Sequence, residues 1–384
     1  MKKFLLSFIS LVLIVCFVVT LQIGAAATPE MPNLTLDCKS ALLMEASTGT
    51  VLYEQSADVA LPPASVTKIM TILLTMEAID SSMMSLTDKL QASEYAASMG
   101  GSQVFIEPGE VLTVEELLKS VVIASANDAA VVLAESIAGS VEGFVSKMNA
   151  RASELGMKNT NFENPTGLDD NTVNHVTSAR DIAIMSRELL KHETVLNYTT
   201  IWMDTIRNGE FGLTNTNRLI RFYNGANGLK TGSTSNAGFC ISATAKRDGM
   251  QLIAVVMASP TRDVRNECAK KLLDYGFANY SVAEFKEGSA GQLNIIGGVK
   301  EQIDVYHPEL SLLVGKGQNK NVEYTVNLPD YVSAPVTAGQ VLGDIVYTLN
   351  GNEIGRVDLV AGESVERLNY LQIVTKLLLN CLGF

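Results

Sequence analysis

Histidine and cysteine are scarce in this chain of 384 residues, and their scarcity excludes several kinds of site. The three histidines lie far apart in the sequence: His175, His192 and His307. Neither an H-E-x-x-H motif nor a Cys/His cluster occurs, which argues against a metalloenzyme. The cysteines beyond the first apolar segment fit no metal site or disulfide framework: Cys38, Cys240, Cys268 and Cys381. We therefore expect buried or semi-buried free thiols, no bound metal and no other cofactor.

Basic residues are also fewer than acidic ones. The 29 Lys and Arg residues face 41 Asp and Glu residues, so the net charge is −12. Non-specific nucleic-acid binding needs a basic surface, so nucleic acid is not an expected partner. With 47% hydrophobic and 18% charged residues, the chain can fill a sizeable core, and intrinsic disorder is not expected. Its length predicts two or three domains.

The first 27 residues have the pattern of a secretory signal peptide. Lys2 and Lys3 precede an almost wholly apolar run over residues 4–23, and three alanines end at Ala27. Cleavage there would place the mature protein outside the cytoplasmic membrane. The apolar run is also long enough to span a bilayer, so an uncleaved anchor is the alternative.

Extended segments at both ends of the next region predict one antiparallel sheet. Residues 38–46 and 50–54 flank a Ser-Thr-Gly turn, and residues 237–246 and 250–259 flank an Arg-Asp-Gly turn, so each pair predicts a hairpin. Helical patterns occupy residues 65–78, 113–124, 128–138, 143–155, 178–190 and 264–279. The predicted fold class is therefore α+β, an antiparallel sheet covered by helices with an inserted helical subdomain.

The remaining sequence changes character twice. Residues 283–365 alternate polar and apolar positions between Gly-, Asn- and Pro-rich turns, which predicts a small all-β domain. Residues 366–384 place a polar stripe opposite an apolar one, which predicts an amphipathic helix at a membrane interface, with a helix packed on the protein as the alternative. The expected division is a signal peptide (1–27), a catalytic domain (28–282), the β domain (283–365) and this helix.

Three short motifs occur in an order that indicates a serine acyl-transfer site. The first, S-x-x-K, is Ser65-Val66-Thr67-Lys68 at the start of a predicted helix. The second, S-x-N, is Ser125-Ala126-Asn127 between two predicted helices. The third, K-T-G, is Lys230-Thr231-Gly232 ahead of a predicted hairpin. Each motif alone is a weak signal. Together they are typical of penicillin-binding proteins and class A β-lactamases.

The residue types suit this chemistry. Helix positions i and i+3 share a face, so Lys68 lies beside Ser65 and, with its pKa lowered by other cations, can act as its base. Backbone N–H groups at the helix start and at Ser233 favour an oxyanion. We expect Ser125 to relay the proton to the leaving group and Asn127 to bind the substrate backbone and hold Lys68.

The third motif suits a carboxylate and a closely approaching substrate. Lys230 supplies a charge and Thr231 a hydroxyl donor. Gly232 lets the substrate lie against the strand without a Cβ clash.

The chain resembles the low-molecular-mass penicillin-binding proteins with serine-type D-alanyl-D-alanine carboxypeptidase activity. Segments beyond the three motifs carry this resemblance: residues 63–70, 108–109, 125–130, 164–168, 175–181 and 228–232. The resemblance covers essentially the whole chain. It implies a β-lactamase/penicillin-binding-protein-like catalytic domain, a peptidoglycan stem-peptide substrate, covalent inhibition by β-lactams, and attachment to the outer face of the cytoplasmic membrane through the C-terminal helix.

The resemblance also implies roles for single residues. Ser65 is the acylated nucleophile, Lys68 the base, and Lys230 and Thr231 the ligands of the terminal carboxylate. Arg265 matches an arginine near that carboxylate, and a solvated charge in a helical first turn is the alternative interpretation. His175 falls in a part of the pattern that is structural, so it is expected to cap or fix a loop.

The resulting prediction is a carboxypeptidase that removes the last D-alanine from pentapeptide stems through an acyl-enzyme on Ser65. A DD-endopeptidase or a β-lactamase with the same site residues is the enzymatic alternative. A class A β-lactamase would lack the β domain and would carry a deacylating glutamate motif that we do not find. A catalytically silent wall-binding protein is the alternative from another class, and the intact motifs argue against it.

Overall fold

The computed structural model describes residues 34–382, so the predicted signal peptide lies outside the described residues. Its central sheet has the strand order β2-β1-β9-β8-β7, and every neighbouring pair is antiparallel. The strands are β1 (Ser40–Glu45), β2 (Val51–Gln55), β7 (Ala226–Thr234), β8 (Gly238–Arg247) and β9 (Met250–Ser259). The sheet built from both ends of the region is therefore confirmed, and β7, which carries the K-T-G motif, is one of its two edge strands.

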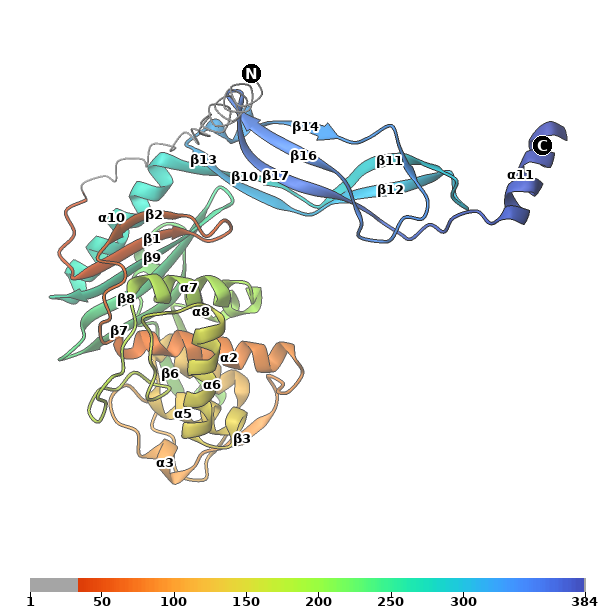
Figure 1. Cartoon of the computed structure of the whole chain (residues 1–384). Coiled ribbons are helices and arrows are strands. Elements are labelled where there is room, and N and C mark those ends of the chain that lie inside the picture. Colours follow the sequence, from red (N-terminus) through yellow and green to blue (C-terminus); the bar gives the residue numbers. More distant parts are fainter. Residues whose placement is uncertain (1–33, 383–384) are drawn as a thin grey trace, which may run out of the picture. The chain divides into compact units, whose positions relative to one another are not determined.

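The sheet separates two hydrophobic cores because successive side chains of a strand point to opposite faces. Leu42 and Val255 belong to the core that contains α2 (Lys68–Asp80) and α7 (Ala179–Leu190). Leu43 and Leu252 belong to the core under α10 (Arg262–Asn279). Figure 1 shows α10 on one face of the sheet and α2 with α7 on the other.

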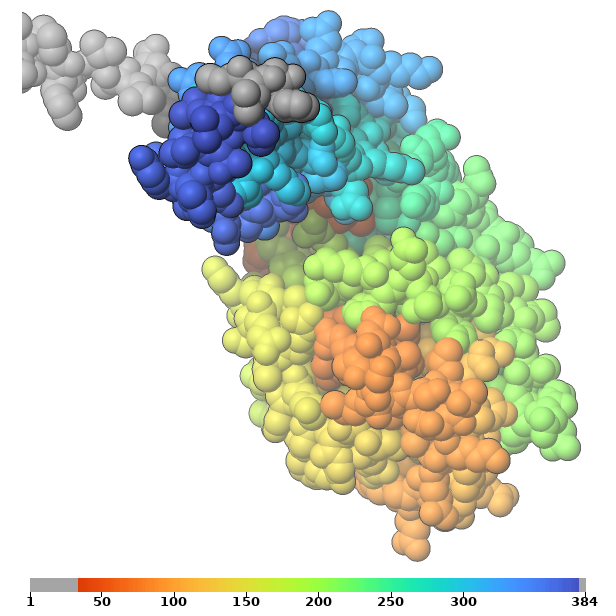
Figure 2. Space-filling view, turned by 90° about the vertical axis from the view of Figure 1, so that its right-hand side faces the viewer, coloured from red at the N-terminus to blue at the C-terminus, as the bar shows by residue number. Residues whose placement is uncertain are grey.

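The helical subdomain inserted between β2 and β7 confirms the predicted helices, with small shifts at their ends. It comprises η1 (Ala64–Thr67), α2, α3 (Glu94–Ala97), α4 (Val114–Lys119), η2 (Ser120–Ala124), α5 (Asn127–Ala138), α6 (Val141–Glu154), α7, η3 (Glu193–Val195), α8 (Leu196–Thr199) and α9 (Leu219–Phe222). The predicted capping box is present, since Thr113 and Glu116 bond reciprocally at the start of α4. In Figure 2 the orange surface of the segment after α2 lies against the yellow surface of the α5–α6 region.

Two small hairpins complete this region. One pairs β3 (Lys89–Gln91) with β4 (Val111–Thr113), and the other pairs β5 (Met203–Ile206) with β6 (Phe211–Thr214). The turn of the second hairpin, η4 (Arg207–Gly209), has Arg207 and Asn208 in the left-handed region, with φ of 54° and 52°. Neither strand pair was predicted from the sequence, because strands of three or four residues are too short to show an alternating pattern.

The C-terminal part is all-β, as predicted. A six-stranded sheet has the order β14-β16-β17-β12-β11-β15, and β10 pairs separately with β13. The strands are β10 (Tyr280–Phe285), β11 (Gly288–Ile296), β12 (Gln302–His307), β13 (Leu310–Gly315), β14 (Glu323–Asn327), β15 (Tyr331–Ser333), β16 (Val341–Leu349) and β17 (Asn352–Ala361), with η5 (Gln318–Asn321) between β13 and β14. Strand β10 spans the predicted boundary at residue 283.

The last described element is the helix α11 (Tyr370–Leu382), where an amphipathic helix was predicted. Its apolar side chains are exposed, for example Leu371 at 74% and Leu378 at 59%. Among the described residues, no single helix combines the length and apolar character needed to cross a membrane.

Candidate active site

The three motifs, which are far apart in the sequence, meet at one cavity of about 560 Å³. Six of the predicted site residues line it: Ser65, Ser125, Thr231, Gly232, Ser233 and Arg265. The other three, Lys68, Asn127 and Lys230, lie behind its wall with exposed fractions of 0%, 1% and 1%. The structure therefore brings all nine predicted residues together.

Lys68 lies at the centre of this arrangement. Its Nζ is 3.0 Å from Ser65 Oγ, 2.5 Å from Asn127 Oδ1 and 2.7 Å from the backbone oxygen of Thr166. Burial and the nearby charge of Lys230 hold the pKa of Lys68 well below its usual value. A neutral amine has two N–H groups and one lone pair. The amide and carbonyl oxygens can only accept, so they take the two N–H groups, and the lone pair is left for the Ser65 hydroxyl.

The S-x-N motif begins directly after a π-helical turn that follows α4. The turn η2 ends at Ala124, its C-cap Ser125 has a left-handed φ of 65°, and α5 begins at Asn127. This turn aims Ser125 into the cavity, and π-helical turns are frequent at functional sites. Asn127 is held from the other side, since its backbone N–H donates to Ser102 O at 2.7 Å and its Nδ2 donates to Gly100 O at 2.6 Å.

Gly232 is needed for a reason that the sequence did not reveal. A Cβ at this position would lie 2.7 Å from Ser65 N and 2.9 Å from Pro63 O. Such distances are too short for van der Waals contact, so β7 can pack against the backbone of Ser65 only because residue 232 is glycine. Space for the substrate, the reason expected from the sequence, stays a prediction.

Lys230, Thr231 and Arg265 form the polar end of the cavity. Lys230 Nζ donates to Thr231 O at 3.0 Å, and Thr231 Oγ1 donates to Thr216 Oγ1 at 2.8 Å. Burial, and next the charge of Arg265, lowers the pKa of Lys230 to about 7. Arg265 is only 3% exposed and donates to Asn266 Oδ1 at 2.8 Å. The alternative interpretation of Arg265 as a solvated charge is therefore wrong.

His175 fixes a loop, as expected. It is 5% exposed, its Nδ1 accepts from the backbone N–H of Glu163 at 3.0 Å, and its Nε2 lies 2.8 Å from Thr67 Oγ1. Since Nδ1 accepts, the ring proton is on Nε2 and is donated to Thr67, the neighbour of Lys68. Burial is the largest effect that lowers the pKa of His175 to about 4.

Comparisons with known proteins agree with this geometry. Residues 25–261 match the peptidase family described as D-alanyl-D-alanine carboxypeptidase, and residues 278–367 match the C-terminal domain of penicillin-binding protein 5. The chain is 42% identical over 351 residues to the D-alanyl-D-alanine carboxypeptidase DacF of Bacillus subtilis (strain 168), covering 90% of each chain. It belongs to the D-alanyl-D-alanine carboxypeptidase family.

Solved structures of related proteins show the same fold. Penicillin-binding protein 5 from Haemophilus influenzae is 31% identical, with a TM-score of 0.76, and the match covers 88% of this chain and 99% of that one. Penicillin-binding protein D2 from Listeria monocytogenes, solved in an ampicillin-bound form, is 34% identical with a TM-score of 0.59. That match covers 64% of this chain and 100% of the other. The penicillin-binding-protein-like fold predicted from the sequence is confirmed.

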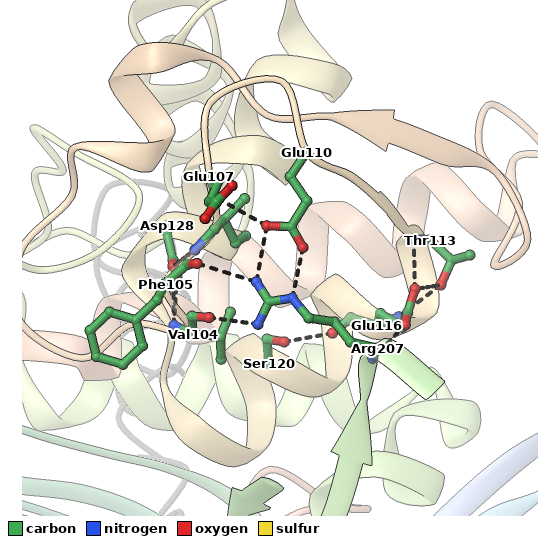
Figure 3. Close-up of polar contacts among 10 residues, drawn as sticks. Val104, Phe105, Glu107, Glu110, Thr113, Glu116, Ser120, Asp128 and Arg207 are labelled. Carbon is green, nitrogen blue, oxygen red and sulfur yellow. Dashed lines mark hydrogen bonds and ion pairs between the residues drawn. The ribbon is translucent and has the colours of Figure 1, made fainter. Parts of the chain in front are cut away.

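The residues that hold the S-x-N wall of this carboxypeptidase were not predicted from the sequence (Figure 3). The buried carboxylate of Asp128 accepts the backbone N–H groups of Val104 and Ile106 at 3.0 and 3.1 Å. Arg207 forms a two-point ion pair with Glu110, at 2.7 and 3.0 Å, and its Nη1 donates to Val104 O at 2.9 Å.

The segment held in this way, residues 100–106, is the one whose carbonyl oxygens bind Asn127. The position of Asp128, next to the S-x-N motif, was an available signal. Arg207 lies in an unpredicted hairpin, and nothing in its local sequence indicates its role.

The low pKa of His175 predicts a pH-dependent stability. An unfolded histidine titrates near 6.5, whereas folded His175 titrates near 4, so the unfolded state binds more protons between these values. The contribution of His175 to the free energy of unfolding should therefore have its full value above pH 6.5. It should fall by up to about 3 kcal/mol as the pH drops to 4. Urea titrations followed by the fluorescence of Trp202, the sole tryptophan, measure this.

The variant His175→Gln should lose most of this dependence between pH 6.5 and 4, whereas His307→Gln should keep it. An unchanged pH dependence in His175→Gln would show that other groups cause the acid destabilisation.

The Arg207–Glu110 pair predicts a long-range effect on acylation. Glu110→Gln removes the charge of one partner while the side chain keeps its size, so residues 100–106 and Asn127 are held less firmly. Acylation by a penicillin should slow by about tenfold, the equivalent of one weakened charge-assisted hydrogen bond. Stopped-flow labelling measures the rate. Glu154→Gln, which removes an exposed partner of Arg151, is the matched control and should leave the rate unchanged. Equal rates in all three proteins would contradict this role.

Proposed function

We propose that this protein removes the terminal D-alanine from peptidoglycan pentapeptide stems by way of an acyl-enzyme on Ser65. The observation that carries the proposal is the environment of Lys68. A buried amine with a lowered pKa has its lone pair directed to a serine hydroxyl 3.0 Å away. This pair is an activated nucleophile, since a serine attacks only when an adjacent base takes its proton.

The remaining site residues supply the other steps. Lys68 takes the proton of Ser65 Oγ as this oxygen attacks the carbonyl of the penultimate D-alanine. The backbone N–H groups of Ser65 and Ser233 receive the oxyanion. The proton then passes through Ser125 to the departing nitrogen, and free D-alanine leaves. Water hydrolyses the ester and restores Ser65, so no metal or other cofactor is needed.

Substrate recognition depends on the other wall of the cavity. Asn127 binds the peptide backbone while its Oδ1 holds Lys68. Thr231 and the charges of Lys230 and Arg265 bind the terminal carboxylate by charge-assisted hydrogen bonds. A β-lactam carries a carboxylate and a reactive amide in a similar arrangement, which is why we expect it to acylate the same serine.

An assay with a synthetic acyl-D-Ala-D-Ala peptide tests the proposed function. The protein should release one D-alanine per peptide and should gain the mass of one penicillin on the peptide that contains Ser65. Ser65→Ala should abolish both reactions, and Lys68→Ala should slow acylation by about 10²–10⁴-fold. Labelling that persists in Ser65→Ala, or that maps to Ser125, would refute the assignment of the nucleophile.

We further propose that the enzyme works outside the cytoplasmic membrane and is held at its outer face by α11. Support comes from the signal-peptide pattern of residues 1–27 and from the exposed apolar side chains of the helix. Lys376 is paired with Glu301, so little basic charge remains to attract anionic lipid. The division into a catalytic domain over residues 28–282 and a β domain over residues 283–365 is part of the same proposal.

Deletion of residues 368–384 tests the role of the helix. The shortened protein should leave the membrane fraction and keep its activity on the acyl-D-Ala-D-Ala peptide. The intact protein should stay bound at high salt, because apolar contact rather than charge holds it. Membrane retention of the shortened protein would indicate an uncleaved N-terminal anchor instead.

A further inference from the structure

The polar end of the active-site cavity carries more positive charge than one carboxylate can neutralise. Three arginines line the cavity: Arg218, Arg262 and Arg265. No aspartate or glutamate of residues 34–382 lines it. Within the described part of the chain, none of the three arginines forms an ion pair. We call these three residues the arginine cluster. In a protein with a net charge of −12, such a cluster indicates an anionic ligand.

The cations of this region repel one another. Burial, and next the charge of Arg262, lowers the pKa of Arg265 to about 10, and this effect of Arg262 exceeds the opposing one of Asp263. Arg265 in turn lowers the pKa of Lys230, whose ammonium group is buried with the backbone oxygen of Thr231 as its partner. A single terminal carboxylate offsets one of these charges and leaves the exposed pair, Arg218 and Arg262, without a counter-ion.

An apolar wall stands beside the cluster. Trp202 and Phe222 both line the cavity, and their rings pack edge to face with centroids 6.1 Å apart. The guanidinium of Arg221 lies 5.6 and 5.7 Å from the two ring centroids, so this fourth arginine makes cation–π contacts with both rings. Rings next to cations suit a side chain that has an aliphatic stem and an acidic end.

The leaving residue is the part of the substrate that meets this surface. Its terminal carboxylate lies at Thr231 and Arg265 in the proposed function, and Arg262 and Arg218 are the cations that act on Arg265. We infer that the arginine cluster and the Trp202–Phe222 wall form a subsite for an acidic side chain on the leaving residue. The enzyme then cleaves D-alanyl bonds to D-amino acids that carry a second carboxylate faster than bonds to neutral D-amino acids of the same size.

The chemical step is that of the proposed function, on which this inference rests. Ser65 Oγ forms an ester with the D-alanyl carbonyl, and the C–N bond to the leaving residue breaks. The nitrogen takes the proton that Ser65 gave up, so the leaving residue departs as a free amino acid with two carboxylates. Water then cleaves the ester and leaves the shortened peptide and Ser65.

Three N-acylated peptides that differ only in the last residue test the subsite: D-Ala-D-Ala, D-Ala-D-Glu and D-Ala-D-Gln. D-glutamate and D-glutamine have the same size, so their ratio isolates the charge. We expect kcat/KM for D-glutamate to exceed that for D-glutamine by about tenfold, as for one charge-assisted contact. In the double variant Arg218→Gln/Arg262→Gln this ratio should fall to about one. Arg356→Gln, a distant arginine of β17, should keep the wild-type ratio.

Binding is measured separately from turnover. In Ser65→Ala the peptides bind without reaction. Trp202 is the sole tryptophan and lines the cavity, so a change in its fluorescence measures peptide binding. The Kd for the D-glutamate peptide should be lower than that for the D-glutamine peptide by a similar factor, and the double variant should remove the difference.

The outcomes separate this inference from the proposed function. Cleavage of D-Ala-D-Ala with no preference for D-glutamate over D-glutamine would refute the proposed subsite, while the proposed carboxypeptidase function would still hold. Failure to cleave all three peptides would overturn the proposed function itself. A preference for D-glutamate that survives in the double variant would show that other residues than Arg218 and Arg262 recognise the second carboxylate.

Discussion

The burial of the Lys68 side chain is the constraint on which the rest of the active site depends. A lysine removed from water must either find a counter-charge or lose its proton, because desolvation disfavours the ammonium form. Among residues 34–382 no carboxylate forms an ion pair with it, and the charge of Lys230 lowers its pKa more than the charge of Asp128 raises it. The oxygens of Asn127 and Thr166 satisfy the two N–H groups of the neutral amine, so its lone pair faces Ser65. Burial thus lowers the pKa of Lys68, as the proposed role of a base requires.

Each neighbour of Lys68 comes from a separate part of the chain, and the fold holds each one independently. Gly232 allows β7 to lie directly against the backbone of Ser65. His175 bonds to Thr67 from the loop that also supplies Thr166. Residues 100–106 hold Asn127, and they are held in turn by Asp128 and by the Arg207–Glu110 pair. The site is therefore rigid because its supports are buried or ion-paired.

Charge divides the cavity into two functional ends. At the first end, burial lowers the pKa of Lys68 and so favours its neutral form. At the second end, burial also lowers the pKa of Arg265. A guanidinium group keeps its proton even so, and this end of the cavity stays positively charged. In the proposed function, a peptide with a free carboxylate binds at the second end, which places its scissile carbonyl at the first. Arg218 and Arg262, for which the described part of the chain supplies no ion pair, extend this positive surface toward solvent.

The amino-acid sequence by itself determined the order of the motifs, the hairpins of the central sheet, the capping box at Thr113 and the family. These features depend on residues that are close in the chain, where helix and strand periods apply. Only the tertiary structure decided that the oxygen of Thr166 completes the contacts of Lys68, that Arg265 is buried, and that Arg207 supports Asn127 from a hairpin. Such contacts join segments up to about a hundred residues apart, and no local periodicity encodes which backbone oxygen or guanidinium will meet there.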